Sequence, residues 1–328
     1  MTMLWPIRSA FAVLGRVAPG LAARWAVDLF FTPRGRRGSQ RVSAFLAAGR
    51  PFEVTVDGER VAGWSWGSSG PNVYLVHGWA GVGGQLAAFG PALLANGFRV
   101  VTFDAPGHGV SEGRRSSIVH FAKALQAAVV SQGRAHAVIA HSLGAAATLR
   151  AITRGLAVER VVLLGPTRGP RDWAEQFRRQ LGIPRPVMEQ MRVRSERWLG
   201  ARWEEFDVPE MARGQRAPML LFHDRNDAEV PWSDGAAIAS AWPGARFVTT
   251  VGLGHRRILR DEHVVADSVA FLKGDAGVGV GESYAAAWVG RCASPGCANA
   301  PVDGGLCESC SLETSLYYRD SRQGASAA

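Results

Sequence analysis

Ser142 stands in a sequence context that can make a serine hydroxyl nucleophilic. The segment Ala140-His-Ser-Leu-Gly144 follows an apolar run at 135–140 and precedes a helix-forming run at 145–152. A sharp turn from a strand into a helix forces the serine into a strained conformation, so small residues are needed on both sides of it. The helix that follows would also aim free backbone N–H groups, first that of Leu143, at a negative oxygen developing on a substrate.

A histidine and a carboxylate later in the chain could complete this chemistry. His255 ends the segment Gly252-Leu-Gly-His, directly after an apolar run at 245–251, and Asp224 and Asp227 follow the apolar run at 218–222. A neutral imidazole can accept the serine proton and return it to the leaving group, while a carboxylate fixes its tautomer and stabilises the imidazolium. Serine, carboxylate and histidine in this chain order are candidates for hydrolysis through an acyl-enzyme.

Short apolar runs alternating with helical patterns must hold these side chains together. Such alternation is typical of a mostly parallel sheet flanked by helices, which makes the expected fold class α/β. The expected strands are 72–76, 98–103, 135–140, 160–164, 218–222 and 245–251, and the expected helices are about 85–96, 117–132, 142–154, 232–241 and 261–273. Alternating apolar residues in 52–66 around Asp57-Gly58 predict a β-hairpin before the first of these strands.

The order of strands, elbow serine, long insertion, acid and histidine resembles the α/β-hydrolase superfamily over about residues 52–273. The family pattern usually has glycine where this chain has Ala140, and alanine still leaves room for the turn. The resemblance implies the α/β-hydrolase fold and a serine hydrolase with Ser142 as nucleophile and His255 as general base. Epoxide hydrolases and haloalkane dehalogenases resemble the same pattern but need aspartate at the elbow, so serine at this position disfavours those reactions.

The family pattern also distinguishes between the two aspartates. It places the acid four residues after a histidine and three residues before Val-Pro, and Asp227 satisfies both counts in the segment His223-Asp-Arg-Asn-Asp-Ala-Glu-Val-Pro231. The resemblance therefore implies that Asp227 orients the catalytic histidine. Asp224 is a nearby alternative, for which a loop role is expected.

Two further segments resemble loops of the same family. His77-Gly-Trp-Ala-Gly81, directly after the expected strand 72–76, resembles the oxyanion loop, in which Trp79 would donate the second backbone N–H beside that of Leu143. An ordinary glycine-rich turn with a structural histidine is the alternative, and under either interpretation His77 orders the loop. Phe103-Asp-Ala-Pro-Gly-His-Gly109 resembles a segment in which Asp104 and His108 stabilise a turn.

About fifty residues separate the expected strands 160–164 and 218–222, more than a simple crossover needs. Residues 167–216 are therefore expected to form a helical insertion above the sheet, acting as a lid. Its aromatic residues suggest an apolar acyl pocket, with Trp173, Phe177 and Trp198 as the expected pocket residues. Aromatic side chains of this kind are equally explained as the insertion's own core.

The net charge of +9 sits mainly at the front of the chain. Residues 1–50 contain eight arginines and one acidic residue, whereas the residues from 274 onward contain three arginines and six acidic residues. This distribution argues against general nucleic-acid binding. Arginines at every eighth position interrupt the apolar front segment, so we expect no secretory signal and a cytoplasmic protein. No apolar run is long enough to span a membrane.

Residues 1–50 are interpreted as basic amphipathic helices that break at Pro19-Gly20. Helices of this kind either pack against the main domain or lie on an anionic membrane surface, so a peripheral membrane contact is a second possibility. The expected organisation is this helical segment at 1–50, a hydrolase domain at 51–273 and a linker at 274–290. A cysteine-rich knuckle at 291–312 and a disordered tail at 313–328 complete it.

All four cysteines lie in the knuckle: Cys292, Cys297, Cys307 and Cys310. Two close pairs joined by a loop can wrap four thiolates around a tetrahedral Zn²⁺, in a segment that resembles a zinc-ribbon or treble-clef knuckle. With four protein ligands the metal would be structural, and no cofactor is expected for catalysis. Two disulfides, or a redox pair formed by Cys307 and Cys310, are the alternatives.

Two functions from different classes follow from these features. The first is a serine hydrolase of carboxylic esters or thioesters that acts on a small acyl substrate. The second is a non-enzymatic protein of the same fold that recruits a protein partner through the zinc knuckle. The complete set of serine, acid and histidine favours the enzyme, because a binding protein does not require all three.

Overall fold

A β-hairpin begins the sheet, as the alternating pattern predicts. In the computed structural model, which describes residues 5–34, 40–275 and 283–285, β1 (Arg50–Val56) pairs antiparallel with β2 (Glu59–Trp66). The backbone turns at Asp57 and Gly58, whose φ angles are 51° and 87°. Positive φ at both central residues matches the twist of paired strands. The Asp-Gly pair therefore sets the register of the hairpin.

The apolar runs that follow form a nine-stranded sheet within the described residues, with strand order β1-β2-β4-β3-β5-β6-β7-β8-β9. The pairs β1–β2 and β2–β4 are antiparallel, and the other neighbouring pairs are parallel. Parallel strands buried on both faces have continuous apolar sequences, and each predicted strand lies within two residues of the observed bounds. The strands after the hairpin are β3 (Asn72–Val76), β4 (Arg99–Phe103), β5 (Ala135–His141), β6 (Val158–Leu164), β7 (Met219–Asp224), β8 (Arg246–Val251) and the unpredicted β9 (Ser283–Ala285).

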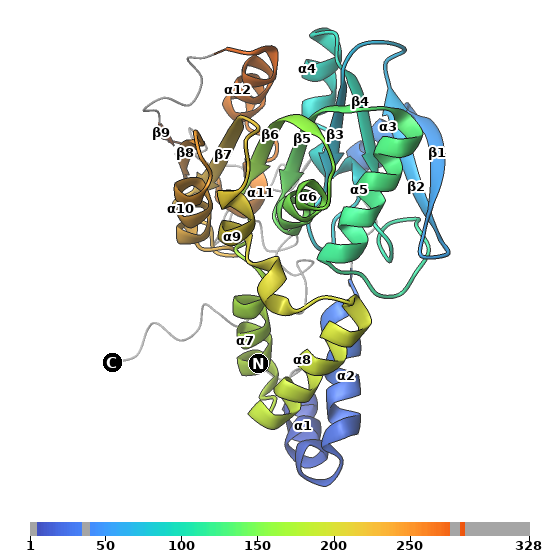
Figure 1. Ribbon diagram of the computed structural model, residues 1–328, viewed down its shortest axis with the longest axis vertical. Helices are drawn as coiled ribbons and strands as arrows, with labels where there is room; N and C mark the ends of the chain where they lie inside the picture. The colour runs from blue at the N-terminus through green and yellow to red at the C-terminus, as the bar shows by residue number, and fades with distance from the viewer. Residues whose placement is uncertain (1–4, 35–39, 276–282, 286–328) are drawn as a thin grey trace.

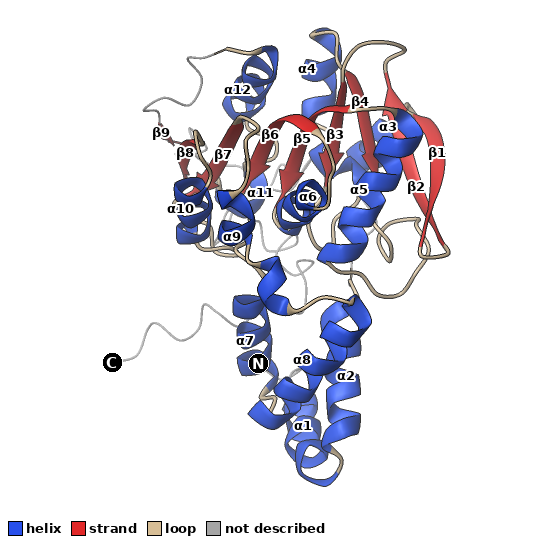
Figure 2. Cartoon of the chain, viewed as in Figure 1, coloured by secondary structure: helices blue, strands red, loops and turns tan. Residues whose placement is uncertain are grey.

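Helices cover both faces of this sheet (Figure 1; Figure 2). One face carries α5 (Ile118–Gln132), α6 (Leu143–Thr153), α9 (Val208–Arg213) and α10 (Trp232–Ala241). The other carries α3 (Gln40–Ala47), α4 (Phe89–Ala95) and α12 (Glu262–Lys273), with the short α11 (Gly254–Arg257) nearby. The helix expected at 85–96 is interrupted, because a 3₁₀ turn η1 (Gly83–Leu86) precedes α4. The sheet and these helices form the expected α/β architecture.

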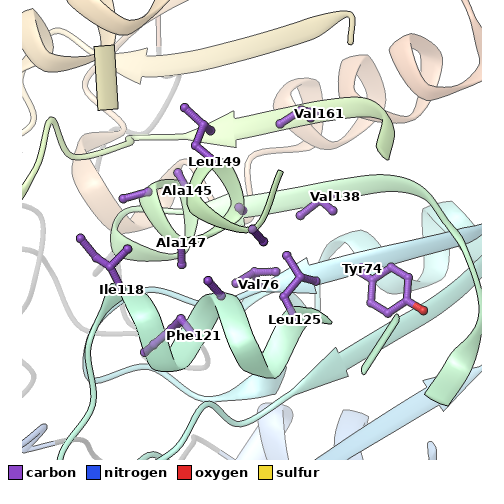
Figure 3. Close-up of a cluster of buried hydrophobic side chains, with 14 of the residues drawn as sticks. Tyr74, Val76, Ile118, Phe121, Leu125, Val138, Ala145, Ala147, Leu149 and Val161 are labelled. Carbon is purple, nitrogen blue, oxygen red and sulfur yellow. The ribbon is translucent and has the colours of Figure 1, made fainter. Parts of the chain in front are cut away.

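The core between α5, α6 and the central strands is built around small side chains. Ala145 and Ala147 of α6 are buried in one apolar cluster with Leu125 of α5 and Val76 of β3 (Figure 3). Alanines let the helix that follows the elbow serine approach the sheet closely, and close packing fixes its orientation. The N-terminus of α6 is consequently held rigidly at the end of β5.

Four helices far apart in the sequence gather below the sheet: α1 (Trp5–Val17), α2 (Pro19–Phe31), α7 (Pro170–Leu181) and α8 (Arg185–Leu199) (Figure 1). We call these four helices the helical cap. Phe11 of α1, Val27 of α2, Phe177 of α7 and Met191 of α8 are buried in one apolar cluster. The 3₁₀ turn η2 (Trp203–Phe206) contributes Trp203 to the same cluster. The front helices thus pack mainly on the insertion that was expected between β6 and β7.

The break between the two front helices lies at Ala18, directly before the predicted Pro19-Gly20. Proline is favoured in the first turn of a helix because it has no N–H that would need a partner there. Among the described residues, no helix is both long enough and apolar enough to cross a membrane.

Within the segment 274–290, for which a linker was predicted, Ser283–Ala285 form β9 and pair in parallel with β8. Backbone hydrogen bonds can extend the edge of a sheet with little regard for side-chain type, so the composition of the segment gave no sign of this strand. Residues 276–282 of the linker, the knuckle at 291–312 and the tail at 313–328 lie outside the described residues.

Candidate active site

Ser142 occupies a strained turn between β5 and α6. Its φ of 52° and ψ of −121° fall in a region that is costly for any residue with a side chain. Two glycines make room for it. A Cβ on Gly144 would lie 2.4 Å from the carbonyl oxygen of His77, and a Cβ on Gly78 would lie 3.0 Å from the Cβ of Ser142. The elbow predicted from the small flanking residues is therefore present in the structure.

Asp227 and His255 meet above the end of the sheet. The Nδ1 atom of His255 lies 2.7 Å from Oδ2 of Asp227, and both side chains are buried. The other carboxylate oxygen accepts backbone N–H groups from Glu229 and Val230 at 2.8 and 2.9 Å. Because a carboxylate accepts, Nδ1 of His255 must carry the hydrogen, and Nε2 is left as the acceptor for a serine proton.

The electrostatics of this pair favour an ionised acid beside a basic imidazole. Burial would raise the pKa of Asp227, but hydrogen bonds from His223 and His255 outweigh burial and hold that pKa below its usual range. Burial would lower the pKa of His255, whereas the hydrogen bond to Asp227 and the charges of Asp227 and Glu229 raise it above 6.5. The carboxylate thus favours the imidazolium form of His255, as a general base in this position would require.

Asp224 serves the loops that position this pair. Its Oδ2 atom accepts hydrogen bonds from Oγ1 of Thr250 and from the backbone N–H of Leu253, both at 2.8 Å. Its Oδ1 atom accepts the backbone N–H of Asn226 at 2.9 Å. A fully buried carboxylate with these partners ties the end of β7 to the loop that carries His255. The loop role expected for Asp224 agrees with these contacts.

The segment after β3 is a tight backbone loop beside the elbow. The backbone N–H of Gly78 donates to Oε1 of Gln85 at 2.8 Å, and that of Ala80 donates to Nε2 of His108 at 3.2 Å. Trp79 lies between these two anchored residues and lines the same cavity as Ser142 and Leu143. The anchored amides on either side fix the orientation of the peptide that contains the Trp79 N–H. This is the arrangement that a preorganised oxyanion donor requires.

Two neutral histidine side chains, those of His77 and His108, hold this loop in place. Nε2 of His77 accepts the backbone N–H of Ala105 at 3.0 Å, and its Nδ1 donates to the carbonyl oxygen of Gly78 at 2.7 Å. Burial lowers the pKa of His77 to about 4. Burial and the nearby charge of a protonated His77 lower the pKa of His108 to about 3. Both rings are therefore uncharged near neutrality and act as fixed hydrogen-bonding struts, as the sequence predicts.

Asp104 stabilises the turn that contains His108. Its Oδ1 accepts the backbone N–H of Gly83 at 2.6 Å, and its Oδ2 accepts that of Val110 at 2.8 Å. Burial raises the pKa of this carboxyl group despite the two hydrogen bonds. The side chain therefore joins η1 to the loop after β4 and does not face the pair formed by Asp227 and His255.

Comparison with known proteins decides the family. The model described as "Alpha/beta hydrolase family" matches residues 73–268, more than half of the chain. This chain belongs to the alpha/beta hydrolase family. An uncharacterized protein of Mycobacterium tuberculosis, present in strains CDC 1551 and H37Rv, is 30% identical over 245 residues, which cover 69% of this chain and 80% of that protein.

Solved structures of esterases share the fold. An esterase from Pyrococcus furiosus has a TM-score of 0.57 at 18% identity, over 74% of this chain and 98% of that one. An esterase from Rhodococcus sp. has a TM-score of 0.52 at 19% identity, over 69% of this chain and 99% of that one. Est1E from Butyrivibrio proteoclasticus, solved with ferulic acid bound, has a TM-score of 0.53 at 18% identity, over 68% and 96%. At these identities the likeness is one of fold alone.

Two residues of this alpha/beta hydrolase that sequence reasoning missed support the histidine loop. Nε2 of His141 lies 3.0 Å from the backbone carbonyl oxygen of His255. Gly165, directly after β6, has a φ of 50°, and a Cβ there would lie 3.2 Å from Nδ1 of His255 and 3.4 Å from Oδ2 of Asp227. Their positions in the sequence could have identified them, because His141 directly precedes the elbow serine and Gly165 directly follows a buried strand.

A cavity of about 230 Å³ opens beside Ser142 and His255, between the sheet and the helical cap. Trp173 and Phe177 of α7 line it, as predicted, and Nε1 of Trp173 donates to Oγ1 of Thr167 at 2.6 Å. The prediction of Trp198 as a pocket residue is wrong. Its ring instead stacks on His120, with a centroid distance of 4.8 Å, and lines a separate polar hollow. Helical periodicity alone did not show which way this residue on α8 points.

Further apolar residues of the cavity come from η2, inside the expected insertion, and from the end of α2, whose approach the sequence did not reveal. Phe30 and Phe31 at the end of α2, together with Trp203 and Phe206 of η2, complete the aromatic wall. The front helix therefore contributes to the candidate active site although about 110 residues separate it from the elbow serine. Only the three-dimensional packing of α2 on the insertion brings these rings to the cavity.

Within the described residues, no group of three or more histidine, cysteine or acidic side chains is arranged to hold a metal ion. The four cysteines of the predicted knuckle lie beyond the described part of the chain. The zinc site at Cys292, Cys297, Cys307 and Cys310 therefore stays a prediction from the spacing of these residues.

Proposed function

We propose that this alpha/beta hydrolase is a serine hydrolase that cleaves carboxylic esters or thioesters through an acyl-enzyme on Ser142. The observation that carries the proposal is the buried contact of 2.7 Å between His255 and Asp227, which opens onto the same cavity as the strained serine. Esterases among the structures that share the fold add support for hydrolysis of this kind.

In the first half of the reaction, Oγ of Ser142 attacks the acyl carbonyl carbon while Nε2 of His255 takes the hydroxyl proton. Backbone N–H groups of Trp79 and Leu143 hold the negative oxygen of the tetrahedral intermediate. His255 then gives its proton to the departing oxygen or sulfur, and the bond from the acyl carbon to that atom breaks. Asp227 stays ionised throughout and stabilises the imidazolium.

In the second half, water replaces the leaving group. Nε2 of His255 takes a proton from the water while the water oxygen attacks the acyl carbon. The ester bond to Ser142 then breaks. The serine oxygen recovers its proton from the histidine, and the carboxylic acid product leaves. The enzyme returns to its starting state without a metal or a second substrate other than water.

The cavity supports an apolar acyl group of modest size. Its aromatic wall offers apolar surface to an acyl or aryl chain, and its volume of about 230 Å³ is small beside the roughly 300–1,000 Å³ typical of ligand pockets. The helical cap closes one side of the cavity, so we propose that it acts as the lid expected from the long insertion. Short and medium acyl chains should therefore be preferred over long ones.

A fluorophosphonate probe, which phosphonylates activated serines, tests the proposal. Wild-type protein should be labelled and should hydrolyse p-nitrophenyl esters of graded acyl length, and Ser142→Ala should do neither. Ser131→Ala, which changes an exposed serine on α5, is the matched control and should behave as wild type. Equal labelling of wild type and Ser142→Ala would refute the assignment. Absence of turnover on esters and thioesters would favour the non-enzymatic alternative.

A further inference from the structure

Four large apolar side chains of the front helices are exposed although the opposite sides of these helices are buried. Trp5, Val13 and Val17 on α1 are 70%, 60% and 74% exposed, and Leu21 at the start of α2 is 58% exposed. Phe11 and Ala22, on the inner sides of the same helices, are fully buried in the cap. The packing of the helical cap therefore does not require these exposed side chains. Their apolar character must have another reason.

Three of these residues, Val13, Val17 and Leu21, lie close together at one end of the molecule, whereas Trp5 stands at the other end of α1. Val13 and Val17 are one helical turn apart on α1, and Leu21 follows just after the turn at Ala18. Figure 1 shows the turn between α1 and α2 at the end of the cap farthest from the sheet. A flat surface can reach this turn without meeting the hydrolase core.

Basic side chains accompany the apolar ones. Arg16 lies between Val13 and Val17 in sequence, Arg24 follows Leu21 by one turn, and both are exposed. Residues 5–27 contain no acidic residue, and the next one, Asp28, forms an ion pair with Arg115. The long stems of arginine can lie along apolar surface while the guanidinium groups reach phosphates.

We propose that Val13, Arg16, Val17, Leu21 and Arg24, which we call the docking surface, bind the surface of an anionic lipid membrane. The valines and the leucine enter the boundary between headgroups and acyl chains, while the arginines bind lipid phosphates. A helix turn with few apolar residues gives peripheral and reversible contact. This inference does not depend on the proposed ester hydrolysis.

The charge pattern favours a membrane over a second copy of the chain. In a symmetric contact the same surface faces itself, so the arginines of one copy would lie against those of the other. Like charges brought together in this way weaken association. An anionic bilayer instead offers apolar depth and negative charge to the same five residues.

Sedimentation of the full chain with lipid vesicles tests the proposal. We expect binding to vesicles of phosphatidylglycerol and phosphatidylcholine mixed in equal parts, and at least about tenfold weaker binding to pure phosphatidylcholine. The double variant Val17→Asp, Leu21→Asp should lower the affinity for the mixed vesicles by at least about tenfold. Val130→Asp, which changes an 87% exposed valine on α5, should bind as wild type.

A second variant separates the electrostatic part from the apolar part. Arg16→Gln together with Arg24→Gln should weaken binding to the mixed vesicles and reduce its sensitivity to salt. Circular dichroism and thermal melting should show that both double variants fold as wild type does.

Three results would overturn the proposal. The first is wild-type binding to the mixed vesicles by both double variants, and the second is no binding by the wild-type chain. The third is a wild-type dimer in size-exclusion chromatography that Val17→Asp, Leu21→Asp converts to a monomer, without any vesicle binding. That last result would identify a second copy of the chain as the occupant of the docking surface.

Discussion

Nε2 of His141 lies 3.0 Å from the backbone carbonyl oxygen of His255, so the residue before the proposed nucleophile contacts the proposed base. A carbonyl oxygen can only accept, so this ring is protonated at Nε2. Burial lowers the pKa of His141 well below 6.5 and keeps the ring neutral. The rings of the two histidines lie 4.4 Å apart between centroids. The elbow and the histidine loop are thereby joined directly.

Replacing His141 by phenylalanine should therefore slow catalysis without removing any reacting group. The aromatic ring keeps most of the volume, but the carbonyl oxygen of His255 loses its donor, which costs about 1–3 kcal/mol when the group stays buried. We expect kcat for a short ester to fall by about 10- to 100-fold, with a smaller change in KM. Steady-state kinetics of His141→Phe measure this effect.

His136→Phe is the matched control for this substitution, because His136 pairs with Glu159 far from the cavity. It should retain wild-type kinetics. If His141→Phe also kept the wild-type kcat, the contact with His255 would have no part in positioning the base.

Asn substitutions at the two aspartates after β7 should have different effects. Asp227→Asn places an amide where Nδ1–H of His255 needs an acceptor, so the wrong tautomer is favoured and kcat should fall by about 10³- to 10⁴-fold. Asp224→Asn weakens the hydrogen bonds from Thr250 and Leu253, so its main effect should be a lower melting temperature. Kinetics and thermal melting of both variants distinguish the roles. A larger loss of kcat in Asp224→Asn would reverse the assignment.

Activity should depend on pH through His255. Only the neutral ring can take the proton of Ser142, and its pKa is raised above 6.5 by Asp227 and Glu229. The value of kcat/KM should therefore fall as the pH falls through this raised pKa, by about tenfold per pH unit on the acidic limb. Glu229→Gln removes one of the charges that raise this pKa and should move the limb to lower pH. An unchanged limb in this variant would contradict the electrostatic account.

The free energy of unfolding should also depend on pH, through two buried histidines whose pKa values are lowered. The pKa values of His77 and His108 are lowered to about 4 and about 3, so the unfolded chain binds protons at these sites before the folded chain does. Each histidine stabilises the fold fully above pH 6.5, and this contribution is lost as the pH falls toward the folded pKa. The slope is at most about 1.4 kcal/mol per pH unit for each group.

Urea unfolding at a series of pH values between 7 and 4 measures this loss. A free energy of unfolding that does not fall between pH 6 and 4 would contradict the lowered pKa values of His77 and His108. His255 has the opposite sign, since its raised pKa stabilises the fold at low pH and this stability is lost as the pH rises.

The sequence was sufficient for the parts of the fold that short-range patterns specify. The hairpin at Asp57-Gly58, the buried parallel strands and the elbow at Ser142 each depend on residues close together in the chain. The acid at Asp227 followed from a local spacing that resembles a family motif, and its contact with His255 agrees with that prediction.

Features that depend on long-range packing could not be predicted in this way. The position of Phe31 in the cavity requires α2 to pack against α8, and no local pattern specifies this pairing. Trp198 is aromatic, as a pocket residue would be, yet its ring stacks on His120 and does not line the cavity. The strand β9 depends on an open sheet edge beside β8, which no side chain in the linker indicates.

The four cysteines of the C-terminal segment carry a prediction that the described structure does not address. Their spacing predicts one tightly bound Zn²⁺ per chain, held by thiolates of Cys292, Cys297, Cys307 and Cys310. Elemental analysis of the gel-filtered full chain should find about one zinc per chain, and Cys307→Ser with Cys310→Ser should abolish it. A site with four protein ligands has no open position, so chelation should leave hydrolysis of a short ester unchanged. Zinc-free protein in which thiol titration under denaturing conditions finds no free cysteines would instead establish two disulfides.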